Sequence, residues 1–412
     1  MIPIRAEALQ SVPRRVVDHY LKPGILNLSA LPPLSLYLHF PWCVRKCPYC
    51  DFNSHEASGE IPEREYLDAL RADLEQSLPL IWGRKIVSIF IGGGTPSLLS
   101  AHGLDRLLSD IRSLLPLDAA AEITMEANPG TVEVARFKSY AASGVNRFSL
   151  GIQSFNPQHL QALGRIHDAD EAQRAVEVAL ACTDNVNLDL MYALPNQSVE
   201  QALYDLETAL RLQPAHLSLY HLTLEPNTVF AKYPPALPDD DVSANMQQQI
   251  QQHMAQAGFE HYEVSAYAKP GRRARHNLNY WEFGDYLGIG AGAHSKLSFP
   301  HRIIRQARFK QPASYLQHAR DGNVIQDEHE VERESLGFEF MLNALRLTEG
   351  VPTRLFIERT GLSTQSIEPA LQRAEAKGLI QADHQRIQPT ELGRSEEHTS
   401  ELQSRVDISY AV

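Results

Sequence analysis

The sequence predicts an α/β fold: an open, partial, TIM-like (β/α)6 barrel followed by a small C-terminal domain of winged-helix-like helical character. Two observations support this prediction. Apolar runs with strand character alternate with helical patterns from residue 34 to about residue 257, and right-handed crossovers turn such a repeat into a parallel sheet. The chemically unusual residues also come directly after the expected strands, where parallel barrels gather their functional groups.

Each of the six units joins one short apolar run to one amphipathic pattern, except the fourth, which has two such patterns. A proline near its start supports the first helix, and glutamines fill the last one. The predicted strands are 34–40, 86–91, 122–126, 147–152, 187–194 and 216–222. The predicted helices are 62–78, 101–114, 132–142, 157–163, 169–181, 199–212 and 241–257, and one further strand is expected at 261–268.

The chain of 412 residues is long enough for this barrel and a second, smaller domain. The expected segments are an N-terminal extension (1–33), the barrel (34–260), a connecting region (261–334), a C-terminal domain (335–393) and a tail (394–412). In the C-terminal domain we expect helices at 336–346, 353–360 and 363–377 and a hairpin at 379–387. The polar tail resembles a translated sequencing adapter, so we expect it not to be native.

Composition narrows the class of protein. The net charge of −12 and the lack of a basic stripe in the C-terminal domain argue against nucleic acid as a partner. No apolar run reaches the roughly 18 residues that a membrane-spanning helix needs, and the first residues lack the apolar segment of a secretory signal. Few cysteines indicate a reducing compartment, so a cytoplasmic protein is expected.

Three of the four cysteines, Cys43, Cys47 and Cys50, form a C-x3-C-x2-C motif directly after the first predicted strand. Thiolates are the ligands of iron–sulfur clusters, and three of them leave one iron of a four-iron cluster without a protein ligand. A zinc site is the alternative, but it needs a fourth ligand, for which His39 and His55 are the neighbours. A disulfide with one spare thiol is the other alternative.

Polar and glycine residues follow the next strands in the same way. The run Gly92-Gly-Gly-Thr-Pro-Ser97 follows the second strand, Glu126 ends the third, Gln153 follows the fourth and Asp189 lies in the fifth. Glycines at a strand end allow a ligand to approach the backbone closely, although such a run is more often a simple turn. The carboxylates would otherwise be surface or capping residues. Their shared position at strand ends favours one ligand site.

These motifs resemble the radical S-adenosylmethionine (SAM) superfamily. The resemblance implies a [4Fe-4S] cluster on the three cysteines, SAM bound at the open iron, and an electron donor for the cluster. In that superfamily the reduced cluster splits SAM to give a 5′-deoxyadenosyl radical. The SAM contacts that the resemblance implies are Tyr37, Gly93, Gly94, Thr95, Glu126, Gln153, Arg165 and Asp189. The planar fork of an arginine such as Arg165 suits the carboxylate of SAM.

A closer resemblance covers about residues 34 to 393. The segments 37–53, 92–97, 150–155 and 187–195 resemble the oxygen-independent coproporphyrinogen III oxidase family. Two features differ from the oxidase itself: Phe52 stands where the oxidase has a further cysteine, and His276-Asn-Leu-Asn-Tyr-Trp281 forms an H-N-x-x-Y-W motif. Both features resemble the HemW subgroup, whose members bind heme and are regarded as heme chaperones.

The H-N-x-x-Y-W motif has a chemistry of its own. Neutral imidazole is an axial ligand of heme iron, so His276 is a candidate ligand, with Tyr280 and Trp281 as flat faces for a porphyrin. The alternative is a hydrogen-bonded histidine in a loop, with Trp281 in the core. The basic residues just before the motif are Lys269, Arg272, Arg273 and Arg275. They could meet porphyrin propionates or form a solvated run of charge.

The resemblance therefore implies a heme chaperone that binds the cluster, SAM and heme and transfers heme to hemoprotein acceptors such as respiratory enzymes, including membrane-associated ones. The alternative is the oxidase reaction of porphyrin biosynthesis, the oxidative decarboxylation of coproporphyrinogen III. A radical SAM enzyme with another substrate is a third class. Phe52 and the H-N-x-x-Y-W motif favour the chaperone, and the complete set of SAM contacts keeps the enzyme open.

Overall fold

The computed structural model describes residues 26–131 and 133–397. Its central feature is a run of six parallel strands with helices between them, as the sequence predicts. The strands are β1 (Leu34–Phe40), β4 (Ile86–Gly93), β5 (Leu117–Ala127), β6 (Arg147–Gln153), β7 (Val186–Tyr192) and β8 (His216–His221), adjacent in that order. The connecting helices are α2 (Glu63–Ser77), α3 (Ala101–Leu114), α4 (Val134–Ser143), α5 (Pro157–Ala162), α6 (Ala169–Leu180), α7 (Val199–Arg211) and α9 (Asp240–Gln256). The limits of β1 and α3 are those predicted.

The same sheet continues beyond the barrel at both edges. The described residues form a 12-stranded sheet in the order β14-β13-β12-β11-β1-β4-β5-β6-β7-β8-β10-β9. The added strands are β9 (Glu260–Glu263), β10 (Ala266–Ala268), β11 (Asp285–Ile289), β12 (His294–Phe299), β13 (Arg302–Arg308) and β14 (Ile325–Glu330). Residues 261–334 therefore do more than connect two domains, because they extend the sheet on both sides.

The prediction of one strand over 261–268 is wrong. The chain reverses between Glu263 and Ala266, so that β9 and β10 form an antiparallel pair and β10 also pairs with β8. A carboxylate oxygen of Glu263 accepts a hydrogen bond from the backbone N–H of Ser265 in the turn, at 3.2 Å. The apolar period alone did not reveal this turn.

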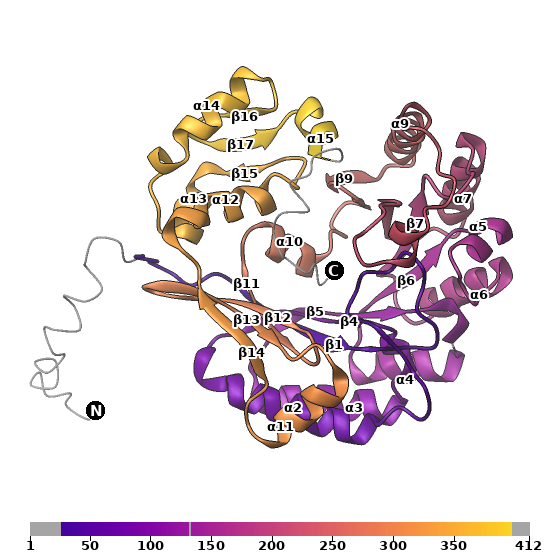
Figure 1. Cartoon of the computed structure of the whole chain (residues 1–412), viewed down its shortest axis with the longest axis horizontal. Helices are drawn as coiled ribbons and strands as arrows, with labels where there is room; N and C mark the ends of the chain where they lie inside the picture. The colour runs from indigo at the N-terminus through magenta and orange to yellow at the C-terminus, as the bar shows by residue number, and fades with distance from the viewer. Residues whose placement is uncertain (1–25, 132, 398–412) are drawn as a thin grey trace, which may run out of the picture.

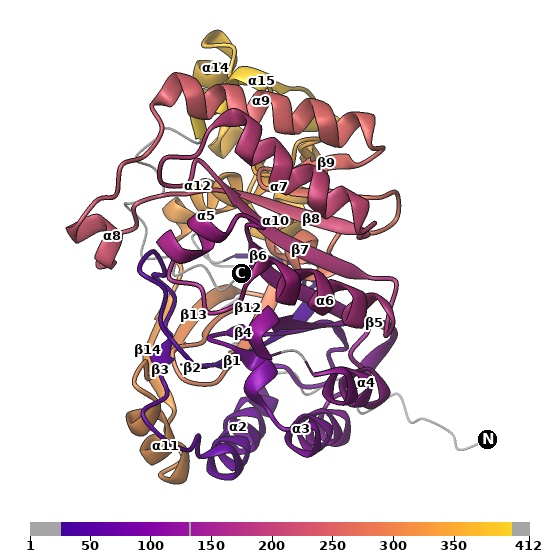
Figure 2. The same cartoon turned by 90° about the vertical axis from the view of Figure 1, so that its right-hand side faces the viewer.

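The smaller elements lie around the sheet. They are β2 (Trp42–Cys43) and β3 (His55–Glu56), the helices α8 (Val229–Lys232), α10 (Arg275–Trp281) and α11 (Pro312–Arg320), and the 3-10 turns Leu78–Leu80, Pro96–Leu98, Pro129–Thr131 and Thr364–Ser366. Figure 1 shows the connecting helices along the outer side of the curved sheet, with α10 inside the curve. Figure 2 shows α2, α3, α4 and α6 in a row on that outer side.

The C-terminal domain combines helices with a three-stranded sheet in the order β15-β17-β16. Its elements are α12 (Arg333–Ala344), β15 (Val351–Pro352), α13 (Thr353–Thr360), α14 (Glu368–Ala376), β16 (Ile380–Ala382), β17 (Arg386–Pro389) and α15 (Glu391–Glu397). The helix predicted at 363–377 is split, because Pro369 lies in the first turn of α14 and lacks the N–H that would continue a helix.

The structure describes part of the expected N-terminal extension and part of the expected tail. Leu26 and Leu28, from the expected N-terminal extension, are buried in one apolar cluster with Phe340 and Phe356 of the C-terminal domain. Helix α15 runs through residues 394–397, the first part of the expected tail. Residues 1–25 and 398–412 lie outside the described part.

The barrel strands alternate between an apolar outer face and a polar inner face. Outward side chains such as Leu36, Ile89, Met125, Phe148 and Leu188 are buried in the main core beneath the helices. The alternate positions, which we call the inner face, carry Ser35, Tyr37, His39, Ser88, Phe90, Glu122, Thr124, Glu126, Arg147, Ser149, Asn187, Asp189, His216, Ser218 and Tyr220. Successive side chains of a strand point to opposite sides. Barrels with a packed interior are filled by branched aliphatic residues, so this polar inner face indicates a site for a polar ligand.

Candidate functional site

The cysteine loop leaves the end of β1 and is held in place by its own neighbours. Cys43 lies in β2 and is buried, while Cys47 and Cys50 are half-buried, and none of them is in a disulfide. The backbone N–H of Cys50 donates to the carbonyl of Cys47 at 3.2 Å, which turns the chain between the two thiols. Burial raises the pKa of both the Cys43 and the Cys50 thiols. Metal binding therefore has to release protons here.

A histidine closes this loop at its base. Nε2 of His39 is 2.8 Å from the carbonyl oxygen of Asn53, so this nitrogen carries the proton and donates. Nδ1 of His39 then accepts from the hydroxyl of Tyr37 at 2.9 Å. The side-chain amide of Asn53 donates to the carbonyls of Ala291 and Lys310, each at 2.9 Å. The two ends of the cysteine loop are thus fixed to β1 and to the segments that flank β12 and β13.

The glycine loop packs directly on the cysteine loop. The N–H groups of Gly94 and Thr95 donate to the carbonyls of Phe40 and Trp42 at 2.7 and 2.8 Å. A Cβ at Gly94 would lie 2.5 Å from the carbonyl oxygen of Trp42, and Gly93 has a φ of +115°. Both positions need glycine. The sequence predicted that a ligand approaches these glycines closely. In the structure it is the backbone of the cysteine loop that lies against them.

Two carboxyls lie on the inner face, on β5 and β7, with β6 between them. Oε2 of Glu126 accepts from the N–H of Gly93 at 3.1 Å. Asp189 accepts from Nδ2 of Asn187 at 2.8 Å and from the hydroxyl of Ser149 at 3.0 Å. Burial, and then the charge of Asp189, raises the pKa of Glu126 to about 8, and burial also raises the pKa of Asp189. The predicted carboxylates do converge on one region.

Arg165 links the cysteine loop to the end of β6. Its Nη1 lies 3.6 Å from Sγ of Cys47, and its Nη2 donates to the carbonyl of Gly151 at 2.6 Å. Its Nε is buried and has no hydrogen-bond partner among the described residues. Gln153, at the same strand end, has a φ of 68°, which is rare for a residue with a side chain. Such backbone is typical of ligand sites.

A small cleft opens beside Cys47. Its lining residues come from the cysteine loop, the glycine loop and the turns after β5 and α5: Val44, Arg45, Cys47, Thr95, Asn128, Thr131, Gly164, Arg165 and Ile166. It brings together one predicted cluster ligand and two predicted SAM contacts, Thr95 and Arg165. The signal that sequence reasoning missed is the pair Asn128 and Thr131, just after Glu126.

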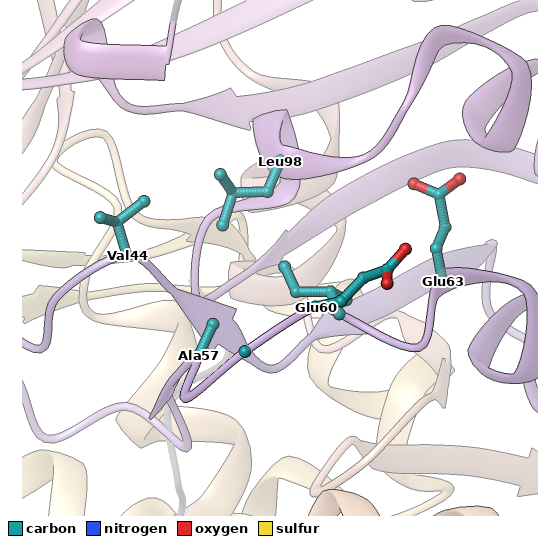
Figure 3. A pocket seen from close by; sticks show the side chains of 7 residues that line it. Val44, Ala57, Glu60, Glu63 and Leu98 are labelled. Atoms are coloured by element: carbon teal, nitrogen blue, oxygen red, sulfur yellow. The ribbon is translucent and has the colours of Figure 1, made fainter.

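A second, more open pocket lies on the other side of Val44 (Figure 3). It is lined by Val44, Ala57, Gly59, Glu60, Ile61, Glu63 and Leu98. The carboxylate of Glu63 is already used, since it accepts from the N–H and the hydroxyl of Ser100, both at 2.6 Å. This pocket contains none of the predicted site residues and offers few donors, so we do not assign the cofactor to it.

The three thiols fit an iron–sulfur cluster better than a single ion. Within residues 26–131 and 133–397, no three His, Cys, Asp or Glu side chains stand close enough together to hold one metal ion. The thiolates of a cubane bind three different irons, so they need not converge on one point. The free Nε of Arg165 is suited to the carboxylate of SAM.

The H-N-x-x-Y-W motif forms α10, not a loop, and lies at the opposite end of the barrel. His276 is 4 % exposed; its ring stacks on Phe90 with centroids 4.9 Å apart, and Nδ1 is 3.4 Å from the hydroxyl of Ser88. Burial and the charge of Arg147 lower the pKa of His276 to about 3, so the imidazole is neutral. The side chain of His276 therefore covers the inner face at the end of the barrel opposite the cysteine loop.

Tyr280 and Trp281 are buried between the barrel and the C-terminal domain. Both belong to the apolar cluster that includes Phe340 and Phe356. The guanidinium of Arg346 lies 4.4 Å from the centre of the Trp281 ring. In this arrangement neither ring presents a flat face to a ligand. The alternative that placed Trp281 in the core agrees with this packing.

The three arginines that precede His276 are engaged with protein groups. Arg272 pairs with Asp184, Nη2 of Arg273 is 2.9 Å from Glu349, and Arg275 donates to the carbonyl of Ala120 at 2.5 Å. Propionates would have to displace these partners.

Comparison with known proteins places the chain in a family. The Radical SAM superfamily model matches residues 37–209, and the HemN C-terminal domain model matches residues 331–395. The heme chaperone HemW of Escherichia coli (strain K12) is 50% identical over 366 residues, which are 88% of this chain and 96% of that protein. The heme chaperone HemW of Bacillus subtilis (strain 168) is 35% identical over 370 residues, 87% of this chain and 96% of that protein.

Comparison with a solved structure agrees with this family. The structure of coproporphyrinogen III oxidase (HemN) from Escherichia coli, described as a radical SAM enzyme, superimposes with a TM-score of 0.76 at 25% identity and covers 88% of both chains. Most of this chain therefore has the same fold as that structure. With the identities above, the chain belongs to the HemW heme-chaperone family of the radical SAM superfamily.

Proposed function

We propose that this protein is a heme chaperone that binds a [4Fe-4S] cluster, SAM and heme and transfers heme to hemoprotein acceptors such as respiratory enzymes. The observation that carries the proposal is the identity of 50% with a protein named heme chaperone HemW over nearly its whole length. Phe52, which stands in place of the oxidase's further cysteine, supports the same reading.

Cys43, Cys47 and Cys50 hold the cluster in this proposal, and its fourth iron is left for SAM. The cluster, once reduced by an electron donor, supplies the electron for cleaving SAM. The chain's own residues position the ligand: the carboxylate of SAM meets Arg165, and Tyr37, Gly93, Gly94, Thr95, Glu126, Gln153 and Asp189 complete the proposed contact set. Arg165 is suited to this task because one of its nitrogens is unused.

The proposed compartment is the cytoplasm, and the proposed acceptors include membrane-associated hemoproteins. Within the described residues, no helix has the length and apolarity that crossing a membrane requires. Exposed apolar side chains lie around the cysteine loop, among them Val44, Phe52 and Ile166, and they offer a contact surface to an acceptor.

His276, Tyr280 and Trp281 are the proposed heme contacts of the H-N-x-x-Y-W motif. Their burial means that α10 has to leave its place before Tyr280 or Trp281 can touch a porphyrin. Heme titration of His276→Ala, followed by absorption, tests this assignment. A loss of the Soret shift supports His276 as the iron ligand, and an unchanged spectrum and affinity removes it from the heme site.

The second candidate is the oxidase reaction, and the resemblance to the structure of HemN favours it. An anaerobic assay of reconstituted protein with coproporphyrinogen III and SAM separates the two functions. The chaperone proposal expects heme binding without formation of protoporphyrinogen. Protoporphyrinogen formed in proportion to the protein would overturn it.

A further inference from the structure

We propose that Arg147 and Thr124, on the inner face of the barrel, bind a free propionate carboxylate of the tetrapyrrole. This inference rests on the proposed heme binding and adds to it the place where the heme is held. The propionate then reaches the middle of the barrel, above α10. Binding at this site therefore requires a ligand whose propionate is not esterified.

The first observation is an unpaired buried charge. Arg147 is 3 % exposed, and within the described residues no carboxylate oxygen lies within 4.0 Å of its guanidinium. Its Nε is buried without a hydrogen-bond partner. The other fully buried arginine, Arg308, is different, because it is 3.3 Å from Asp73 and donates to Ser295 at 2.6 Å. An arginine stays charged in proteins, and an uncompensated buried charge is strongly unfavourable.

The second observation is an unused hydroxyl at the neighbouring position. Thr124 of β5 pairs in register with Arg147 of β6, so both side chains point to the inner face. The hydroxyl of Thr124 is buried and has no partner among the described residues either. A guanidinium and a hydroxyl side by side form a donor set that suits a carboxylate, which accepts several hydrogen bonds.

The carboxyls of the inner face are occupied with other groups. Glu122 accepts from the N–H of Arg275 at 3.0 Å and so caps α10. Glu126 accepts from Gly93, and Asp189 accepts from Asn187. The charge of Arg147 acts on Glu126 and Asp189 only from beyond ion-pair distance.

Arg147 is also the permanent positive charge of this region. The nearby imidazoles of His216 and His276 are kept neutral, because burial lowers the pKa of each. Phe90, in register with Thr124, stacks on Tyr37 and on His276, so the wall beside the charge is aromatic. A flat ligand with an acidic side chain, which is the chemistry of a tetrapyrrole propionate, fits this combination. Arg272 and Arg273, just before α10, already have carboxylate partners.

The test compares heme with its dimethyl ester, which lacks free carboxylates. Cluster-loaded wild type, Arg147→Met and the control Arg320→Met are titrated with each ligand anaerobically. We expect Arg147→Met to bind heme about 10- to 100-fold more weakly while its affinity for the ester is unchanged, because only a charge-assisted bond is lost. Arg320→Met, which changes an exposed arginine paired with Glu65, should behave as wild type.

A second variant and a stability measurement keep the test decisive. Thr124→Val retains the volume and should weaken heme binding several-fold without affecting the ester. Without ligand, Arg147→Met should melt at or above the wild-type temperature, because an unpaired charge is removed. Equal heme affinity of wild type and both variants, or an equal loss for heme and ester, overturns the inference but leaves heme binding intact. A wild type that binds neither ligand overturns the proposed function itself.

Discussion

Nη1 of Arg165 lies 3.6 Å from Sγ of Cys47, although 118 positions separate the two residues in the chain. The same guanidinium donates to the carbonyl of Gly151 at the end of β6. One side chain therefore touches both a predicted cluster ligand and the mouth of the inner face. The cleft beside Cys47 is lined by both residues, so the predicted cluster ligand and the predicted SAM contact meet at one place.

The cysteines give the first prediction. Replacement of Cys47 by Ala should abolish cluster binding, because the motif supplies only three thiolate ligands and the variant would keep two. Iron analysis and the visible absorption of the anaerobically reconstituted protein measure this. Cys182→Ala is the matched control, because Cys182 is far from the motif in sequence and packs against the main core. Equal iron loss in both variants would contradict the assignment.

Arg165 gives the second prediction. Arg165→Met should lower SAM affinity about 10- to 100-fold, because a bidentate contact to the carboxylate is lost, while iron content stays near that of wild type. Calorimetric titration of the cluster-loaded variant checks it. Arg211→Met is the control, because the guanidinium of Arg211 donates to the hydroxyl of Thr208 on the same helix. SAM affinity that is unchanged in Arg165→Met would remove this residue from the site.

Glu126 predicts a pH dependence of stability in the protein without cofactors. Its pKa rises from 4.5 to about 8 on folding, so between these values the folded state holds a proton that the unfolded state has released. The free energy of unfolding then falls as pH rises through this window, by at most about 1.4 kcal/mol per unit. Glu126→Gln should remove this component.

Urea titrations of wild type and Glu126→Gln at several pH values measure that component. The stability of the variant relative to wild type should grow from about pH 5 to pH 8 and then level off. Glu60→Gln, at an exposed position, serves as the control. A difference between Glu126→Gln and wild type that does not vary with pH would show that Glu126 ionises normally.

The packing of α10 gives the fourth prediction. Trp281 is 3 % exposed in the cluster shared with the C-terminal domain, so Trp281→Ala should cost about 3–5 kcal/mol of stability. Trp82, which is 84 % exposed, is the matched control, and its change to Ala should stay within about 0.5 kcal/mol. Urea unfolding measures both. A fully stable Trp281→Ala would mean that α10 is not packed as described.

Much of the fold could be predicted from the sequence because the strand and helix periods are strong locally. The candidate residues at the strand ends could also be predicted, because parallel strands place their carboxyl ends on one side of the sheet. The packing of His276 and Trp281 was not predictable from the motif, because a seven-residue helix does not reveal which neighbours cover it. The turn between Glu263 and Ala266 was missed because it interrupts one apolar run.

For Arg147 the sequence predicts only that it begins a strand. Its orientation depends on the register between β5 and β6, which the sequence alone does not give. The signal that could have found it is the alternation of Arg147, Ser149 and Gly151 with the apolar residues between them. That alternation places the polar residues on the inner face.

Heme transfer tests the central claim most directly. Protein loaded with cluster and heme is mixed anaerobically with an apo-hemoprotein, and the absorption of the acceptor is followed after the two proteins are separated. The account predicts that heme moves to the acceptor and that the acceptor gains its holo spectrum faster than it does in a mixture with a heme-loaded carrier such as albumin. Heme that never binds, or that stays on the protein while the acceptor remains in its apo form, would contradict the account.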